Sequence, residues 1–436
     1  MKQNKEIPAG YKDSPLGIIP EEWEVKKLGS VFSQITTFSF SRDQMSELEQ
    51  KLRYVHYGDI HKNIERDCIN LKIDELPFLL DDIIPDVKMK DSNFPYLING
   101  DILLTDASED YDGIGKALEI VDTDNKKVIG GLHTIGLRCK TNELVIGFGR
   151  LIFKNEQSSK SLKRIAQGTK VYSISYNYIA KLHVIIPPTE EQVKIVEILN
   201  CWNEAIEKQE QLVEKLERRK RGLTQQLISA RIRIKGFSGS WQTIKMGEVF
   251  KRITRKNAEL NDNIVTISAQ KGFVKQTDFF NKTIASEIID NYFLIKKGEF
   301  CYNKSYSKGY PMGVVKLLSD FDKAVVTTLY ICFALKDSDN SVEFFKHYFD
   351  SGSLNRELTK IANEGGRAHG LLNVTPSDFF DIHIRIPKVE ECSAISEILS
   401  NMDKLIDIER KKLQLICSQK RNLMQQLLTG KTRVNI

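Results

Sequence analysis

One short stretch of the chain combines basic, hydroxyl and aromatic side chains at a spacing that suits binding better than catalysis. Residues 302–310 read Tyr-Asn-Lys-Ser-Tyr-Ser-Lys-Gly-Tyr, so Lys304 and Lys308 alternate with residues that can hydrogen-bond or stack. Ammonium groups neutralise phosphates, and hydroxyl and amide groups can hydrogen-bond the edges of bases. The stretch predicts a loop that contacts a nucleic acid, and a solvated turn is the alternative interpretation.

Two glycine-containing loops, 167–172 and 364–370, offer polar donors of the same kind. The stretch 105–116, which corresponds in position to the loop at 302–310, is acidic apart from Lys116, so charge alone does not mark it. Each loop by itself could equally be a solvated turn, and only the repeated placement favours binding. The candidate nucleic-acid contacts are Lys116, Lys170, Tyr172, Tyr302, Lys304, Ser305, Lys308, Arg367 and His369.

The sequence contains partial matches to catalytic motifs, and each of them lacks required residues. Residues 112–116 (Asp-Gly-Ile-Gly-Lys) resemble part of a phosphate-binding loop, but the first glycine is missing and Ala117 replaces the required Ser or Thr. No strand-GxGxxG-helix pattern offers a pocket for S-adenosylmethionine, and no Asn-Pro-Pro-Tyr-type tetrad could act on an exocyclic amine. His133, His183 and His383 lie in apolar runs, which indicates core histidines. We therefore predict no catalytic residues and no metal site.

A helical stretch occurs twice in the chain, once after each group of candidate loops. These two long helices are therefore the elements expected to position the loops. Residues 189–228 and 389–428 align at a constant offset of 200 positions without a gap. When the alignment is extended back to Ile186 and Ile386, 15 of 43 aligned pairs are identical. Two unrelated surface helices would share this offset only by coincidence.

Both stretches carry a heptad pattern, with steps of four and three residues that place apolar side chains on one helical stripe. Each stripe is interrupted at the same two places, by Gln209 and Lys220 in the first copy and by Glu409 and Lys420 in the second. A polar seam residue costs stability but fixes register and partner choice, so we predict that the two helices pack on each other. The apolar seam positions are Ile195, Leu199, Trp202, Ile206, Val213, Leu216, Leu223, Leu227, Ile395, Leu399, Met402, Ile406, Leu413, Ile416, Leu423 and Leu427.

The rest of the chain is a tandem repeat. Trp23 and Trp241 begin similar segments, which end at Phe32 and Phe250, and Thr189 with Gln192 forms the pattern of a capping box at the first helix. Short branched and aromatic runs alternate with helix-like segments between each tryptophan and its helix. We predict a mixed α/β fold, in which two globular domains with mixed β-sheets are separated by two long helices in a pseudo-twofold repeat. The predicted segments are 1–188 (lead-in and first globular domain), 189–230 (first helix), 231–388 (linker and second globular domain) and 389–436 (second helix and tail).

Composition is that of an ordinary globular protein. Hydrophobic residues make up 41% and charged residues 28% of the chain, and no stretch reaches the apolar length of a membrane span. The seven cysteines are scattered and never form a Cys-x-x-Cys pair, which argues against a disulfide framework and a zinc site. With no apolar signal region at the N-terminus, we expect a protein of the reducing cytoplasm. The net charge of +6 permits a polyanion partner without requiring one.

Several short motifs together resemble the specificity subunits of type I restriction–modification systems. They are the lead-in SPLGIIPEEW with its KKLG continuation, the helix starts IIPPTEEQ and RIPKVEE, and the helix ends RKRGLTQQLI and QKRNLMQQLL. The resemblance covers essentially the whole chain. Each motif alone would be weak, and the combination is specific.

The resemblance implies a non-catalytic DNA reader. Each globular domain would be a target-recognition domain for one half of a bipartite site in double-stranded DNA, and the two helices would run antiparallel as a coiled coil, set the spacer and dock two modification subunits. Those methyltransferase partners would use S-adenosylmethionine to methylate adenine, and restriction subunits that use ATP and Mg²⁺ would join the full complex. The chain itself would need no cofactor and no membrane. Base-reading residues vary in such subunits, so the resemblance assigns none of the candidate contacts.

Two other classes are alternatives. A protein-interaction scaffold would use the helices as an assembly rod, and salt-dependent, sequence-selective retention on DNA would separate a DNA reader from it. A self-sufficient methyltransferase is disfavoured by the missing cofactor motif, and S-adenosylmethionine binding would test it. The length of the helices fits a DNA reader. A seam of 33 residues from Ile195 to Leu227 measures about 50 Å, which equals about one to one and a half turns of DNA. Two readers joined by a rod of matching length bind their two sites with a high effective concentration.

Overall fold

The computed structural model describes residues 7–62, 67–109, 111, 113–168, 171–276, 290–307, 309–337, 341–364 and 372–436. The chain divides into two compact units. Unit 1 comprises Met1–Gln209 and Lys412–Ile436, and unit 2 comprises Glu210–Lys411. Each unit therefore contains one globular part, the first half of one long helix and the second half of the other.

The main sheet of unit 1 has five strands, which lie in the order β4 (Phe32–Ile35), β13 (Thr134–Cys139), β9 (Ile102–Thr105), β11 (Ala117–Asp122) and β7 (Cys68–Asn70). All neighbours are antiparallel except β11 and β7, which are parallel. All four residues of β9 are buried, as expected for an interior strand that is covered on both faces.

Smaller sheets and short helices complete unit 1. One sheet has the order β12 (Val128–Gly130), β6 (Leu52–Val55), β8 (Phe78–Leu79) and β5 (Met45–Ser46). The two-stranded pairs are β1 (Tyr11–Lys12) with β2 (Ile19–Pro20), β10 (Ala107–Ser108) with β14 (Tyr172–Ser173), and β3 (Glu24–Lys27) with β15 (His183–Ile186). The helices are α1 (Leu28–Val31), a 3-10 turn η1 (Arg42–Gln44), α2 (Tyr57–Lys62), α3 (Asp86–Met89), α4 (Gly149–Lys154), α5 (Glu156–Ile165), α6 (Tyr176–Ile179) and the long α7 (Thr189–Ile228).

Unit 2 repeats the main sheet of unit 1 without its fifth strand among the described residues. Its order is β17 (Phe250–Ile253), β24 (Ile331–Leu335), β21 (Phe300–Asn303) and β22 (Val314–Leu317). The pairs are β16 (Gln242–Lys245) with β27 (His383–Ile386), β18 (Val265–Ser268) with β19 (Gly272–Lys275), β20 (Phe293–Lys296) with β23 (Lys323–Val326), and β25 (Asn363–Glu364) with β26 (Leu372–Asn373). The helices are α8 (Met246–Val249), α10 (Val342–Asp350), α11 (Asn355–Ile361), α12 (Pro376–Asp381) and the long α13 (Val389–Leu428).

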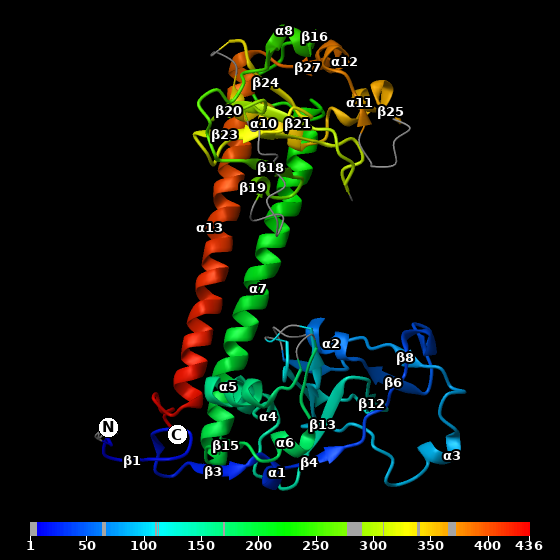
Figure 1. Cartoon of the computed structure of the whole chain (residues 1–436), viewed down its shortest axis with the longest axis vertical. Helices are drawn as coiled ribbons and strands as arrows, with labels where there is room; N and C mark the ends of the chain where they lie inside the picture. The colour runs from blue at the N-terminus through cyan, green and yellow to red at the C-terminus, as the bar shows by residue number, and fades with distance from the viewer. Residues whose placement is uncertain are drawn as a thin grey trace. The chain divides into compact units, whose positions relative to one another are not determined.

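Each of the two long helices is continuous (Figure 1), and each unit holds the start of one helix and the end of the other. In unit 1, Ile195 and Leu199 of α7 share a buried core with Leu427 of α13. In unit 2, Ile395 and Leu399 of α13 share a buried core with Leu227 of α7. The start of each helix therefore lies against the end of the other, and none of the predicted seam positions is exposed. Within each unit, the antiparallel arrangement of the two helices is therefore confirmed at the helix ends.

An arginine–glutamate pair, the arginine clamp, ties the end of one helix to the start of the other in each unit. In unit 1, Nε and Nη2 of Arg433 donate to the carboxylate of Glu191 at 2.9 and 2.5 Å, and Nε1 of Trp23 donates to the same carboxylate at 3.1 Å. In unit 2, Nε and Nη2 of Arg233 donate to Glu391 at 2.6 and 2.8 Å. Both glutamates are buried, so the bidentate pairs fix the helix ends with charge-assisted hydrogen bonds.

The polar seam residue Lys220 also makes a specific contact. Its ammonium group forms an ion pair with Asp403 of α13, whose carboxylate lies 3.9 Å from Nδ1 of His347 in α10. His347 is buried, with Nε2 3.3 Å from Oγ of Ser400. Burial lowers the pKa of His347 to about 4, and Lys220 and Lys346 act in the same direction. The interruption of the seam thus connects both helices to the globular part of unit 2.

Replacing Arg433 with alanine should destabilise unit 1, because the buried Glu191 carboxylate would keep only the Trp23 indole as a donor among the described residues. Leaving a buried polar group under-satisfied costs about 1–3 kcal/mol, so we expect the melting temperature of that unit to fall by about 2–12 °C. Lys431→Ala, a change at an exposed neighbour, is the matched control. Equal thermal unfolding of the two variants would show that the clamp does not hold the helix ends.

His347 should make the stability of unit 2 depend on pH. Its folded-state pKa of about 4 lies below the ordinary value of 6.5, so the unfolded state takes up the proton first as the pH falls. This group therefore removes stability as the pH falls from about 6.5 to 4, by about 3 kcal/mol in total. Asp403 and Asp350 oppose the shift, and Lys220 and Lys346 support it.

The measurement is the urea midpoint of unit 2 as a function of pH. His347→Gln should flatten the curve over this window, whereas His383→Gln, at an exposed histidine of the same unit, should leave it unchanged. A His347→Gln curve that is parallel to the wild-type curve would contradict a buried neutral imidazole.

Candidate nucleic-acid interface

Two equivalent strand ends position the polar loops. The interior strands β9 and β21 end at Thr105 and Asn303, and the next residues are Asp106 and Lys304. The carbonyl oxygen of Asp106 accepts a hydrogen bond from the N–H of Ile174 at 2.9 Å, and that of Lys304 accepts one from the N–H of Leu372 at 3.0 Å. Each strand end is therefore held by the segment that leads into α6 or α12.

A glycine in the left-handed region lies beside each strand end. Gly115 has φ +69° and Gly313 has φ +68°. The N–H of Gly115 donates to the carbonyl of Thr105 at 3.1 Å, and a Cβ atom on Gly313 would lie 2.2 Å from the carbonyl oxygen of Asn303. A side chain at Gly313 would therefore push the loop away from the strand, and at both positions the left-handed backbone favours glycine.

Two of the three predicted contacts of unit 1, Lys116 and Tyr172, are among the described residues. Lys116 is half-buried, and its backbone N–H donates to Oγ1 of Thr105 at 3.1 Å. Tyr172 is half-buried in β14, and its ring meets that of Tyr111 edge to face with the centroids 5.2 Å apart. The ammonium group of Lys163 lies 5.6 Å from the Tyr111 ring centroid. Basic and aromatic side chains gather here, and their contact with a nucleic acid stays a prediction.

The prediction for Tyr302 is wrong. Its side chain is fully buried, stacks on Phe379 with the ring centroids 5.1 Å apart, and donates its hydroxyl to the carbonyl of Met312 at 2.9 Å. Burial also raises the pKa of its hydroxyl. Tyr302 belongs to the core of unit 2, because the loop begins two residues later than its sequence pattern indicates.

Lys304 and Ser305 are the other described candidates of unit 2. Lys304 is half-buried, its Nζ donates to the carbonyl of Val374 at 3.4 Å, and burial lowers its pKa. Ser305 is exposed, and its N–H donates to Oδ1 of Asn303 at 3.0 Å. Both side chains are placed where a ligand could reach them. Lys170, Lys308, Arg367 and His369 lie outside the described residues.

His133 is not a core histidine, which corrects the sequence interpretation. Its side chain is 50% exposed, its backbone has φ +57°, and its Nδ1 lies 3.4 Å from Oδ1 of Asp106. Its ring also meets the Tyr57 ring edge to face at 5.9 Å. His383 is likewise exposed, and His183 is half-buried. The group formed by Asp106, His133 and Tyr57 was missed, and the correspondence of Asp106 with Lys304 in the repeat is the signal that could have found it.

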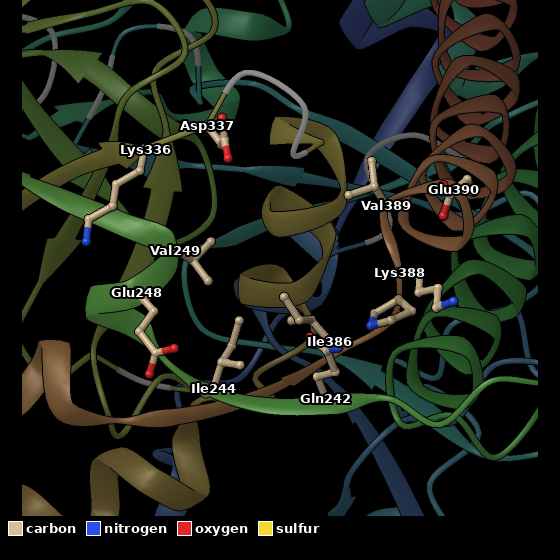
Figure 2. A pocket seen from close by; sticks show the side chains of 11 residues that line it. Gln242, Ile244, Glu248, Val249, Lys336, Asp337, Ile386, Lys388, Val389 and Glu390 are labelled. Carbon is tan, nitrogen blue, oxygen red and sulfur yellow. The ribbon is translucent and has the colours of Figure 1, made fainter.

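A cavity of about 450 Å³ lies at the start of α13 in unit 2 (Figure 2). Figure 2 shows Ile244, Val249 and Ile386 in its middle, with charged side chains on both sides. The charged lining residues are Glu248, Lys336, Asp337, Lys388 and Glu390. Because acidic and basic groups are mixed and none is a predicted contact, the cavity does not have the character of a polyanion site.

The capping box predicted at α7 is wrong. Thr189 is the first residue of the helix. The amide of Gln192 donates to the carbonyls of Pro187 and Glu143 at 2.9 and 2.8 Å, and accepts from the N–H of Val145 at 3.0 Å. Gln192 therefore holds segment 143–145 against the helix start. The corresponding residue of α13 is Cys392, which has no amide to make these bonds, and the cavity of Figure 2 lies at that helix start.

Neither a metal site nor a membrane span is evident in the described part of the chain. No cluster of His, Cys, Asp and Glu side chains there has the arrangement of metal ligands. No helix there has the length and apolarity to cross a membrane.

The two units share a sheet order, a strand-end glycine and an arginine clamp, but their strand-end loops carry different polar residues. A repeated fold with unlike loops is typical of a protein that binds two different targets. A family model described as "Type I restriction modification DNA specificity domain" matches residues 20–218 and 239–417, one match for each copy. The chain belongs to this family, and the resemblance seen in the sequence is confirmed.

Two relatives that are named as specificity subunits align with nearly the whole of this chain. The type I restriction enzyme MjaVIII specificity subunit of Methanocaldococcus jannaschii is 23% identical over 453 residues, which cover 95% of this chain and 94% of that protein. A protein of the same organism that is named as a candidate MjaX specificity subunit is 24% identical, with 97% of each chain covered. Both relatives align along nearly their whole length, which includes both repeats of this chain.

One solved structure confirms the fold. It comes from work on "complex assembly and conformational transition of the type I R-M system", and the matched chain has a TM-score of 0.57 at 14% identity, with 95% of this chain and 99% of that chain covered. Together with the two family matches, this likeness confirms the predicted mixed α/β architecture with two domains and long helices.

Proposed function

We propose that the chain is the DNA-reading subunit of a type I restriction–modification complex and has no catalytic activity of its own. Each globular part would read one half of a bipartite site in double-stranded DNA. The observation that carries the proposal is the repetition of one fold with unlike strand-end loops, within a chain whose two copies both match the DNA specificity family.

The two-headed arrangement suits a bipartite target. Binding of one head raises the effective concentration of the second head at its own half-site, so affinity increases without any new contact. The seam, the arginine clamps and the Lys220–Asp403 pair support this role, because they join the helix halves within each unit into stiff supports. Loops on such supports can differ freely while the frame stays the same.

The helices would also dock two modification subunits. Several apolar side chains exposed on the two helices support a docking role, since a partner that covers them removes apolar surface from water. These are Val193 and Leu212 on α7 and Val389, Ile398, Leu405, Ile408 and Leu415 on α13. The modification subunits would supply S-adenosylmethionine and the methyltransferase site, and restriction subunits would supply the ATP- and Mg²⁺-dependent step.

A direct test is selection of bound duplexes from a random double-stranded library by the chain in complex with its modification subunits. A bipartite consensus, with binding that weakens as salt rises, is expected for a DNA reader. Retention without any sequence preference would instead favour the protein-interaction scaffold.

The purified chain alone should show neither methyl transfer nor DNA cleavage, because its only approach to a phosphate loop, at residues 112–116, is incomplete. The measurement is transfer of a labelled methyl group from S-adenosylmethionine to DNA, with the complex that contains the modification subunits as the positive control. Methyl transfer by the chain without partners would refute the proposal of a non-catalytic subunit.

The two heads should be separable. Exchanging residues 241–386 for the same region of a specificity subunit with a different target should change one half of the methylated site and leave the other half intact. The reciprocal exchange of residues 23–186 is the matched control and should change the other half. If one exchange alters both halves, the heads do not read DNA independently.

A further inference from the structure

Asp106 and Lys304 occupy the same place in the two copies but carry opposite charges. The same offset of 198 residues relates Asp106 to Lys304 and Gly115 to Gly313. Each charged residue directly follows an interior strand, β9 or β21, and the carbonyl of each accepts a hydrogen bond from the segment before α6 or α12. The backbone is therefore fixed in the same way in both units, and the side chain is what differs.

Both side chains are half-buried. Burial raises the pKa of Asp106, and the neighbouring His133 opposes this shift. Burial lowers the pKa of Lys304. In each case the protein environment disfavours the charged form. A half-buried charge of this kind costs free energy unless a hydrogen-bonding partner compensates it.

The partners of the two groups within the described residues are incomplete. Oδ1 of Asp106 lies 3.4 Å from Nδ1 of His133, but it accepts no hydrogen bond of good geometry from any described residue. Lys304 donates to the carbonyl of Val374 at 3.4 Å, and no carboxylate of the described residues lies within ion-pair distance of it. Other lysines of unit 2 are paired, including Lys245 with Asp381 and Lys323 with Glu259.

The surroundings hold both groups in place. His133 has a left-handed backbone, which is strained for a residue other than glycine, and such strain gathers at functional sites. The Tyr57 ring packs against it, so the imidazole beside Asp106 has a defined position. In unit 2, Nδ2 of Asn303 donates to the carbonyl of Ile267 at 3.3 Å, which anchors the residue before Lys304. Both charged groups are thus preorganised.

We propose that Asp106 and Lys304 each read one base pair in the major groove. Asp106 would accept a hydrogen bond from the exocyclic amino group of adenine or cytosine, and Lys304 would donate to O6 or N7 of guanine. This inference rests on the proposed function, because it assigns base-reading residues to the same two heads. One half of the target then requires an amino group at the position that faces Asp106, and the other half requires a guanine that faces Lys304.

A contact with a phosphate is the competing role for Lys304, and a solvated turn is the competing role for either residue. Loss of a phosphate contact weakens binding to all sequences alike. It also reduces the slope of log binding constant against log salt concentration by about one. A base contact instead lowers affinity for one base pair relative to its substitutes. The two roles therefore differ in what a substitution does across a panel of DNA sequences.

The experiment measures binding of the complex with its modification subunits to labelled duplexes that carry every single base-pair change in the wild-type site, at two salt concentrations. Asp106→Leu and Lys304→Met keep about the size of the side chains while removing both their charge and their hydrogen-bonding groups. Each should reduce discrimination by about tenfold or more at one base pair of one half-site and leave the other half-site unchanged. Glu49→Gln and Lys297→Met, at exposed residues of the same units, are the matched controls.

Unchanged discrimination at every base pair would overturn the proposal, and so would a uniform loss of affinity with a lower salt slope for Lys304→Met. If a variant fails to fold, as judged by its melting temperature, Asp106→Ala and Lys304→Arg take its place. Lys304→Arg should keep the preference for guanine, and its loss would count against base reading. A wild-type complex without sequence preference would refute the proposed function itself, which separates the two failures.

Discussion

The contact of the start of each long helix with the end of the other is the interaction on which each unit depends. A helix of 40 residues with a mostly polar surface gains its stability from packing rather than from propensity. In unit 1, Ile195 and Leu199 supply this packing, and they lie in the same core cluster as residues of the main sheet, among them Leu104 of β9. Unit 2 uses Ile395 and Leu399 in the same way. The helix seam and the sheet core are therefore one continuous apolar interior within each unit.

The strands that lead into the long helices carry this constraint to the loops. β15 pairs with β3, and β27 pairs with β16, so the tryptophan segment of each copy is bonded along the strand that enters the helix. Trp23 then reaches Glu191 in the first turn of α7, where Arg433 completes the arginine clamp. Because the first and last segments of each globular part are fixed on the helix pair, the interior strand and the loop at its end have a fixed place as well.

The repeat, the fold class and the seam could be predicted from the sequence, because a helical period and a constant offset extend over many residues. The errors concern single positions, where one residue decides between core and surface. Tyr302 is polar enough for a loop but is the last inward-facing residue of β21, and His133 lies in an apolar run but occupies a turn with a left-handed backbone. Gln192 fits a capping box by spacing, yet bonds to segment 143–145 because that segment packs across the helix start.

The arginine clamp could not be recognised from local patterns, because its partners are far apart in the chain, with 242 positions between Arg433 and Glu191 and 158 between Arg233 and Glu391. The repeat itself contains the missing information. Arg233 and Arg433 differ by the same 200 positions as the helices, as do Glu191 and Glu391, so both partners recur together. A paired recurrence of opposite charges outside the seam indicates a contact that both copies need.

Departures from the repeat are informative for the opposite reason. The arginine clamp, the strand-end glycine and the sheet order recur because they hold the frame, whereas Asp106 and Lys304 differ although their backbones are bonded alike. A backbone that is fixed by main-chain hydrogen bonds tolerates any side chain that the site can solvate or pair. A substitution that changes the charge at such a position therefore leaves intact the core that packs against the helix start. For a protein whose two heads must tell two different half-sites apart, the end of an interior strand is therefore the place where a difference in recognition costs the fold least.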